Sequence, residues 1–98
     1  MFNLDEVLRM LRLAIGRLER APVDLAEVPV VQAARADLER VLEVLSGHAS
    51  VYVVNPSAAL RAVAKSLQPL SDPEVHAAWV DTVEAAIMVE ASTREGPV

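Results

Sequence analysis

The chain has 98 residues, of which 53% are hydrophobic and 23% charged, and its net charge is −5. This length fits one domain with a single core, and the large apolar share excludes a disordered chain. The chain has no cysteine, which excludes disulfides, thiolate metal sites and cysteine nucleophiles, and its acidic balance argues against a nucleic-acid surface, which needs clustered Lys and Arg.

The hydropathy pattern bears on location and on partners. Charged residues interrupt the first twelve positions, where a signal peptide needs a continuous apolar segment, and no uncharged run is apolar enough to span a membrane. We therefore expect a cytoplasmic protein with no membrane partner. The mean hydropathy of +0.31 is high for a lone monomer of this size, so we expect another chain to cover part of the apolar surface.

The first helix is expected over Leu4–Arg20. Asn3 is a suitable N-cap, with Glu6 three residues on as a capping box requires. The apolar residues of this segment recur at steps of four and three, as in a heptad seam. They are Leu4, Leu8, Leu11, Ile15 and Leu18, widened by Val7 and Ala14. Asp5 and Arg9 are spaced to form an ion pair on the solvent-exposed face.

The second helix is expected over residues 29–47, with a proline in its first turn and a glycine at its end, after a short helical turn at 24–27. Its apolar residues fall in one arc of roughly 100° on a helical wheel. They are Val31, Ala34, Leu38, Val41, Leu42 and Leu45. Asp37 projects away from the other charges. It is either a carboxylate at the edge of the bundle that reaches water, or one held by Arg17 or Arg61 across an interface.

Residues 48–54, HASVYVV, favour extended backbone, yet nothing else in the chain offers a strand to pair with them. We expect an extended connector or a frayed helical turn lying on the bundle. The alternative is an edge strand that pairs with its own copy in a second subunit. Val51, Tyr52 and Val53 are therefore candidate interface residues.

Two further helices begin with the same signal, a capping Asn or Asp followed by Pro. The third should run over residues 56–67 and the fourth from 73 to 91 or 92. This leaves 93–98 as a flexible tail outside a single helical domain of residues 1–92. The apolar arc of the fourth helix holds Val75, Ala78, Trp79, Val83, Ala86 and Ile87. Val80 and Met88 lie toward or beyond the edge of this arc, which makes them candidate interface residues.

The short connections favour antiparallel neighbours, so the expected fold is all-α, an up-down antiparallel four-helix bundle with a short extended segment near 48–54. The residues expected to anchor its core are Leu11, Ile15, Leu38, Leu42, Leu60, Trp79 and Val83. We expect Trp79, near the middle of the fourth apolar arc, to be the principal anchor.

No residue pattern points to catalysis. Serine-nucleophile motifs, glycine-rich phosphate loops and paired E-x-x-H metal motifs are missing, so we expect no enzyme activity, cofactor or metal site. His48 and His76 are expected to be structural. Glu90 falls within the fourth apolar arc, either as a buried carboxylate with a raised pKa or as a partner of Arg94 in water.

The sequence thus indicates a non-catalytic helical protein–protein interaction module, either a homodimer or a small subunit of a larger assembly. One alternative is a bundle that binds a small apolar or acidic ligand through Arg17, Arg61 or His76. Another is an acidic, antitoxin-like regulatory partner of a basic protein.

Overall fold

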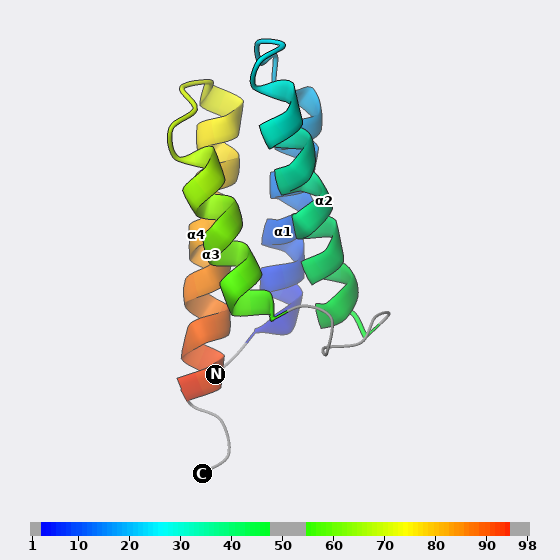
Figure 1. Cartoon of the computed structure of the whole chain (residues 1–98). Helices are drawn as coiled ribbons and strands as arrows, with labels where there is room; N and C mark the ends of the chain where they lie inside the picture. Colours follow the sequence, from blue (N-terminus) through cyan, green and yellow to red (C-terminus); the bar gives the residue numbers. More distant parts are fainter. Residues whose placement is uncertain (1–2, 48–54, 95–98) are drawn as a thin grey trace.

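A computed structural model describes residues 3–47 and 55–94 of the chain (Figure 1). Its elements are α1 (Leu4–Arg20), α2 (Val28–Leu45), α3 (Pro56–Leu67) and α4 (Pro73–Arg94). Consecutive helices run in opposite directions, and α4 also packs on α1, which closes the ring. The predicted all-α up-down four-helix bundle is confirmed. The extended segment predicted near 48–54 lies outside the described residues.

Short polar side chains begin three of the helices. Asn3, Asn55 and Asp72 each accept a hydrogen bond, through a side-chain oxygen, from the backbone N–H three residues on, at 3.1–3.2 Å. Asp72 Oδ1 also accepts one from the N–H of Glu74 at 2.9 Å. These bonds satisfy N–H groups that have no partner within the helix, which is why the predicted starts of α1, α3 and α4 are found where the sequence places them.

The two ends of α2 are set by backbone geometry. The N–H groups of Glu27 and Val28 both donate to the Asp24 carbonyl, at 2.9 and 3.2 Å, so the predicted helical turn is present and α2 begins one residue earlier than expected. At the other end Gly47 has φ +81°, and its N–H bonds to the Val44 carbonyl at 3.1 Å. Glycine adopts this left-handed conformation without the strain of a side chain, so the helix stops there.

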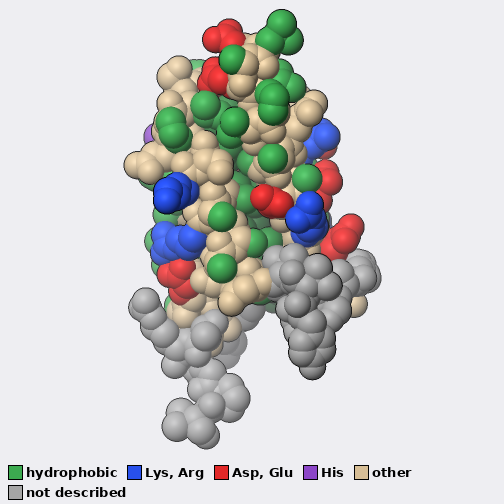
Figure 2. All heavy atoms as spheres, in the orientation of Figure 1, with side chains coloured by type: hydrophobic (Ala, Val, Ile, Leu, Met, Phe, Trp, Pro, Cys, Tyr) green, Lys and Arg blue, Asp and Glu red, His purple; other side chains and the backbone are tan. Residues whose placement is uncertain are grey.

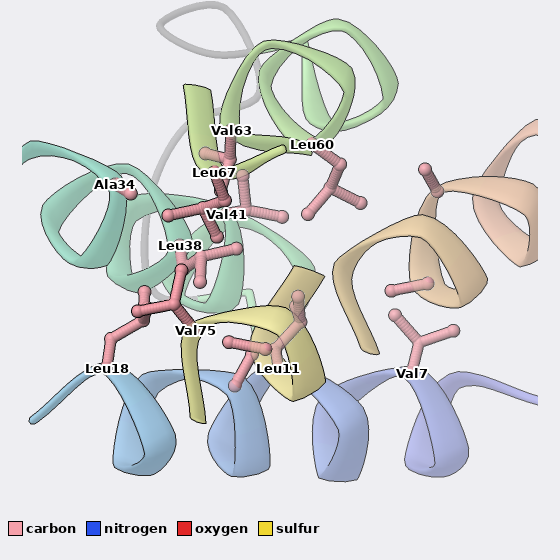
Figure 3. Close-up of a cluster of buried hydrophobic side chains, with 14 of the residues drawn as sticks. Val7, Leu11, Leu18, Ala34, Leu38, Val41, Leu60, Val63, Leu67 and Val75 are labelled. Atoms are coloured by element: carbon pink, nitrogen blue, oxygen red, sulfur yellow. The ribbon is translucent and has the colours of Figure 1, made fainter. Parts of the chain in front are cut away.

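Side chains from all four helices meet in one core, where they point toward one another (Figure 3). The largest fully buried ones are Leu11, Leu38, Leu60, Leu67, Val7, Val41, Val63, Val75 and Thr82. Three of the expected anchors, Leu11, Leu38 and Leu60, are thus fully buried. The other four are only half-buried; they are Ile15, Leu42, Trp79 and Val83.

The buried stripe of α1 differs slightly from the predicted seam. Its buried residues are Val7, Leu11, Ala14 and Leu18, which also recur at steps of four and three. Leu4 is 39% exposed, and Leu8 and Ile15 are half-buried. Because α1 packs against both α2 and α4, its buried stripe points between these two helices, and residues beside that stripe remain partly in solvent.

The face that α4 turns to the core also differs from the prediction. Its buried residues are Val75, Ala78, Thr82, Ala85, Ala86 and Val89. The centre of this set lies about 60° around the helix from the centre of the predicted arc, at 100° per residue. Ile87 was expected to face the core and is 52% exposed instead. Since α4 has apolar residues on more than one side, its periodicity alone does not specify which side packs inward.

Alanines and one threonine lie in the middle of the face that α4 packs against the core. The Thr82 hydroxyl is fully buried and donates to the Ala78 carbonyl at 2.8 Å, so its polar group is satisfied within its own helix. The expectation that Trp79 is the principal core anchor is wrong. Trp79 packs against the edge of the core and stacks on His76, with ring centroids 5.4 Å apart.

Candidate functional site

The two arginines proposed as ligand contacts are bound to carboxylates of α4. Arg17 Nε donates to Asp81 Oδ2 at 3.0 Å in a partly buried ion pair between α1 and α4. Arg61 forms a bidentate pair with Glu90 between α3 and α4, with Nε–Oε2 at 2.7 Å and Nη2–Oε1 at 2.8 Å. The hydrogen bonds to Glu90 raise the pKa of Arg61. Both arginines therefore tie neighbouring helices to α4.

This arrangement decides between the two interpretations of Asp37. Its carboxylate lies 3.3 Å from Arg40, one turn along α2, and its side chain is 42% exposed. The interpretation in which Arg17 or Arg61 holds Asp37 is wrong, because both of these arginines bind carboxylates of α4. Asp37 is an edge carboxylate in contact with solvent.

The predicted setting of Glu90 needs a similar correction. Glu90 accepts the two hydrogen bonds from Arg61 and a third from the Ser57 hydroxyl at 3.2 Å. It is therefore not an isolated buried carboxylate, and Ser57 and Arg61 of α3 both bind it. The sequence does not reveal this pairing, because Ser57 and Arg61 lie about thirty residues away and become neighbours only when the bundle closes.

On the surface of α1, Arg9 pairs with Glu6 and not with Asp5 as predicted. Arg9 Nε donates to Glu6 Oε2 at 3.1 Å, and Nη2 binds the other oxygen. The hydrogen bond from Arg9 lowers the pKa of Glu6, and the same bond raises the pKa of Arg9. A residue three positions away is as accessible on a helix as one four positions away, so spacing alone does not specify the partner.

The described part of the chain holds neither a cluster of metal-binding side chains nor a helix able to cross a membrane. His76 is exposed and stacks on Trp79, and within residues 3–47 and 55–94 no three His, Asp or Glu side chains gather closely enough to hold a metal ion. In those same ranges, no helix combines the length and the apolarity that crossing a bilayer requires.

Apolar residues on the outer side of α4 form a partly exposed strip. Val80, Val83 and Ile87 follow one another at steps of three and four, so they share one face of the helix. Ile87 is 52% exposed, and the two valines are partly exposed. We call these three residues the outer strip. Met88, the other α4 candidate, packs against the core edge on a different side of the helix.

The remaining interface candidates, Val51, Tyr52 and Val53, lie outside the described residues. Val80 is thus the one predicted interface residue that the structure places on the outer strip. Sequence reasoning assigned Val83 and Ile87 to the core, because their spacing fits an inward-facing arc equally well.

A second apolar feature lies at the α1–α2 connection and was not predicted. A pocket of about 190 Å³ opens there, and its apolar lining consists of Leu18, Ala21, Val23, Val28 and Val31. Arg35 stands at this pocket with Glu19, their closest charged atoms 3.7 Å apart. Beside it, Leu25 is 90% exposed. The sequence carries no periodic signal for this feature, because the pocket forms only where the ends of α1 and α2 meet.

These observations describe a bundle with satisfied ion pairs between its helices and apolar side chains left outside its core. Such a surface can bind other chains through apolar contact. No protein-family model matches this chain, and no curated protein and no solved structure matches it.

Proposed function

We propose that the protein is a non-catalytic, cytoplasmic helical module for protein–protein interaction, acting as a homodimer or as a small subunit of a larger assembly. The observation that carries this proposal is the outer strip of α4, formed by Val80, Val83 and Ile87. A second chain that covers the strip would remove this apolar surface from water, which is favourable by roughly 25 cal/mol per Å².

The residue types on the outer strip support the same proposal. Valine and isoleucine form helices less readily than the Glu, Lys or Arg that usually occupy an exposed helix face. Three β-branched residues therefore lower the intrinsic helix stability of α4 without contributing to the buried core. A partner that covers them would bury the part of their surface that this monomer leaves exposed, most of it on Ile87.

The test is sedimentation velocity of the purified protein over roughly 1–100 µM, an interval that brackets ordinary dimer affinities. We expect the wild-type protein to self-associate as its concentration rises. We expect Ile87→Lys to weaken association by about tenfold or more, because the lysine ammonium would have to be desolvated in the contact. Lysine at this position keeps helix propensity and lies one turn from both Glu84 and Glu90.

The matched control is Ala62→Lys, which adds the same charge at an exposed position of α3. It should sediment like the wild-type protein. A wild-type protein that remains monomeric throughout the range contradicts self-association. Equal weakening by the two lysine variants would assign the effect to net charge and remove the outer strip from the proposal.

A further inference from the structure

Leu25 has the highest exposure of the large hydrophobic side chains in the described part of the chain, at 90%. It lies in the α1–α2 connection, at the end of the bundle where Figure 2 shows hydrophobic side chains beside acidic ones. A leucine in this position gains nothing from its own fold, since it points away from the core. Contact with another molecule would remove this side chain from water.

The connection holds Leu25 in an ordered place. The N–H groups of Glu27 and Val28 both donate to the Asp24 carbonyl, which closes a helical turn around Leu25. Prolines at 22 and 29 bracket this turn and restrict its backbone further. A side chain presented on such a turn loses little conformational freedom when it binds.

The pocket beside this turn is large enough to receive one aliphatic side chain, and its lining combines apolar residues with Glu19, Gln32 and Arg35. Its volume is about 190 Å³, and its apolar walls include Leu18, Val23, Val28 and Val31. An engineered apolar cavity of about 150 Å³ accommodates a benzene molecule, so a leucine side chain of four carbons fits this one. Leu25 of the same molecule does not occupy it, because that side chain is almost fully exposed.

We propose that Leu25 inserts into this pocket on a second copy of the chain, and that the second copy inserts its own Leu25 in return. Val23 and Val28 flank Leu25 in the sequence and line the pocket, so the projecting side chain and the pocket lie next to each other. A two-fold axis through this end of the bundle therefore satisfies both contacts at once and closes the assembly.

Charge complementarity also favours a second copy as the occupant. Asp24 and Glu27 lie on either side of Leu25, and Arg35 stands at the pocket. The Arg35 guanidinium is 3.7 Å from Glu19, too far for a hydrogen bond, so it retains donors for an incoming carboxylate. Insertion of Leu25 brings the two acidic residues of one copy to the Arg35–Glu19 pair of the other, where Arg35 offers its remaining donors.

This contact rests on the proposed function and extends it, because it is a second self-association surface, separate from the outer strip of α4. Two different two-fold contacts on one chain build assemblies larger than a dimer. Loss of either contact should leave a dimer, and loss of both should leave a monomer. The two surfaces can therefore be tested separately.

The experiment is sedimentation velocity of the full chain carrying substitutions on each side of the contact. Leu25→Ser removes the projecting side chain, and Ala21→Phe fills the pocket without altering Leu25. We expect each to weaken the association at this end by about tenfold or more. Leu25→Met, which keeps a long apolar side chain, should associate like the wild-type protein.

Ala62→Ser on the exposed face of α3 is the control for a serine substitution, and melting curves verify that every variant is folded. Combining Leu25→Ser with Ile87→Lys should give a monomer. If Leu25→Ser and Ala21→Phe sediment like the wild-type protein while Ile87→Lys dissociates it, the Leu25 contact is overturned and the proposed function stands. A wild-type monomer at all concentrations overturns both self-association contacts, the Leu25 contact and the outer strip.

Discussion

Leu38 and Leu42 lie one turn apart on α2, but only Leu38 is completely shielded from solvent. We expect Leu38→Ala to lower the free energy of unfolding by about 2–5 kcal/mol, because it removes buried methyl groups and leaves a cavity. Leu42→Ala should cost clearly less, since its half-buried site has solvent contact already. Urea unfolding followed by circular dichroism measures both values. Equal losses would contradict the core described above.

The contribution of Glu6 to the stability of the fold is expected to depend on pH. Its hydrogen bond with Arg9 lowers the pKa of Glu6 in the folded state, so near the ordinary carboxyl pKa the unfolded chain binds more protons than the folded one. The stabilisation is therefore present above the ordinary pKa of about 4.5, and is lost as the pH falls through the lowered one. Glu6→Gln should remove this pH-dependent part.

The measurement for Glu6 is the urea midpoint between about pH 3 and pH 7, compared between wild type and Glu6→Gln. Asp5→Asn, in the same helical turn, is the control for loss of one negative charge. If the urea midpoint of Glu6→Gln changes with pH as much as that of the wild-type protein, the Glu6–Arg9 pair does not contribute to the pH dependence of stability. We expect the difference to shrink at high salt, because the pair is exposed.

At the scale of a single element, the start of α4 depends on Asp72. Its side-chain oxygen accepts from the N–H groups of Glu74 and Val75, and its negative charge lies at the positive end of the helix dipole. Asp72→Ala should therefore destabilise the protein by about 1 kcal/mol. Thermal or urea unfolding measures this loss, and Ser71→Ala next to it should have little effect.

The elements also show how far local sequence signals extend. The bounds of α1 and α3 are as predicted, because caps and prolines act within a few residues. The facing side of α4 was predicted only in part. Val75, Ala78 and Ala86 are buried as expected, whereas Trp79, Val83 and Ile87 continue the same periodicity without being buried. A pattern of local spacing cannot distinguish two apolar sides of one helix.

Contacts between segments that are far apart in the chain could not be predicted from the sequence. The Arg17–Asp81 and Arg61–Glu90 pairs connect residues 64 and 29 positions apart. The pocket near Leu25 likewise exists only because the ends of α1 and α2 meet. Candidate interface residues were identified in part, as Val80 lies on the outer strip. Leu25 was missed because a single leucine in a loop carries no periodic signal.

For the whole molecule, association and stability are linked. A chain that associates only when folded becomes more stable as its concentration rises. We therefore expect the melting temperature of the wild-type protein to increase between roughly 1 and 100 µM, by several degrees for a tenfold to hundredfold excess over the dissociation constant. Differential scanning fluorimetry or circular dichroism can follow this shift.

The control for this shift is the double variant Leu25→Ser with Ile87→Lys, whose melting temperature should not depend on concentration. A wild-type melting temperature that is equally independent of concentration would contradict association of the folded chains. An equal shift in both proteins would assign the association to some other surface.

The ion pairs of α4 have one more consequence. Arg17 of α1 and Arg61 of α3 form ion pairs with α4 on opposite sides of that helix, with Asp81 and Glu90 respectively. Rotating α4 about its long axis to bury Ile87 would break both ion pairs. The partly desolvated carboxylates of Asp81 and Glu90 would then lose these arginine partners. The two ion pairs and the buried face of α4 therefore favour the same orientation of this helix, which leaves Ile87 in solvent.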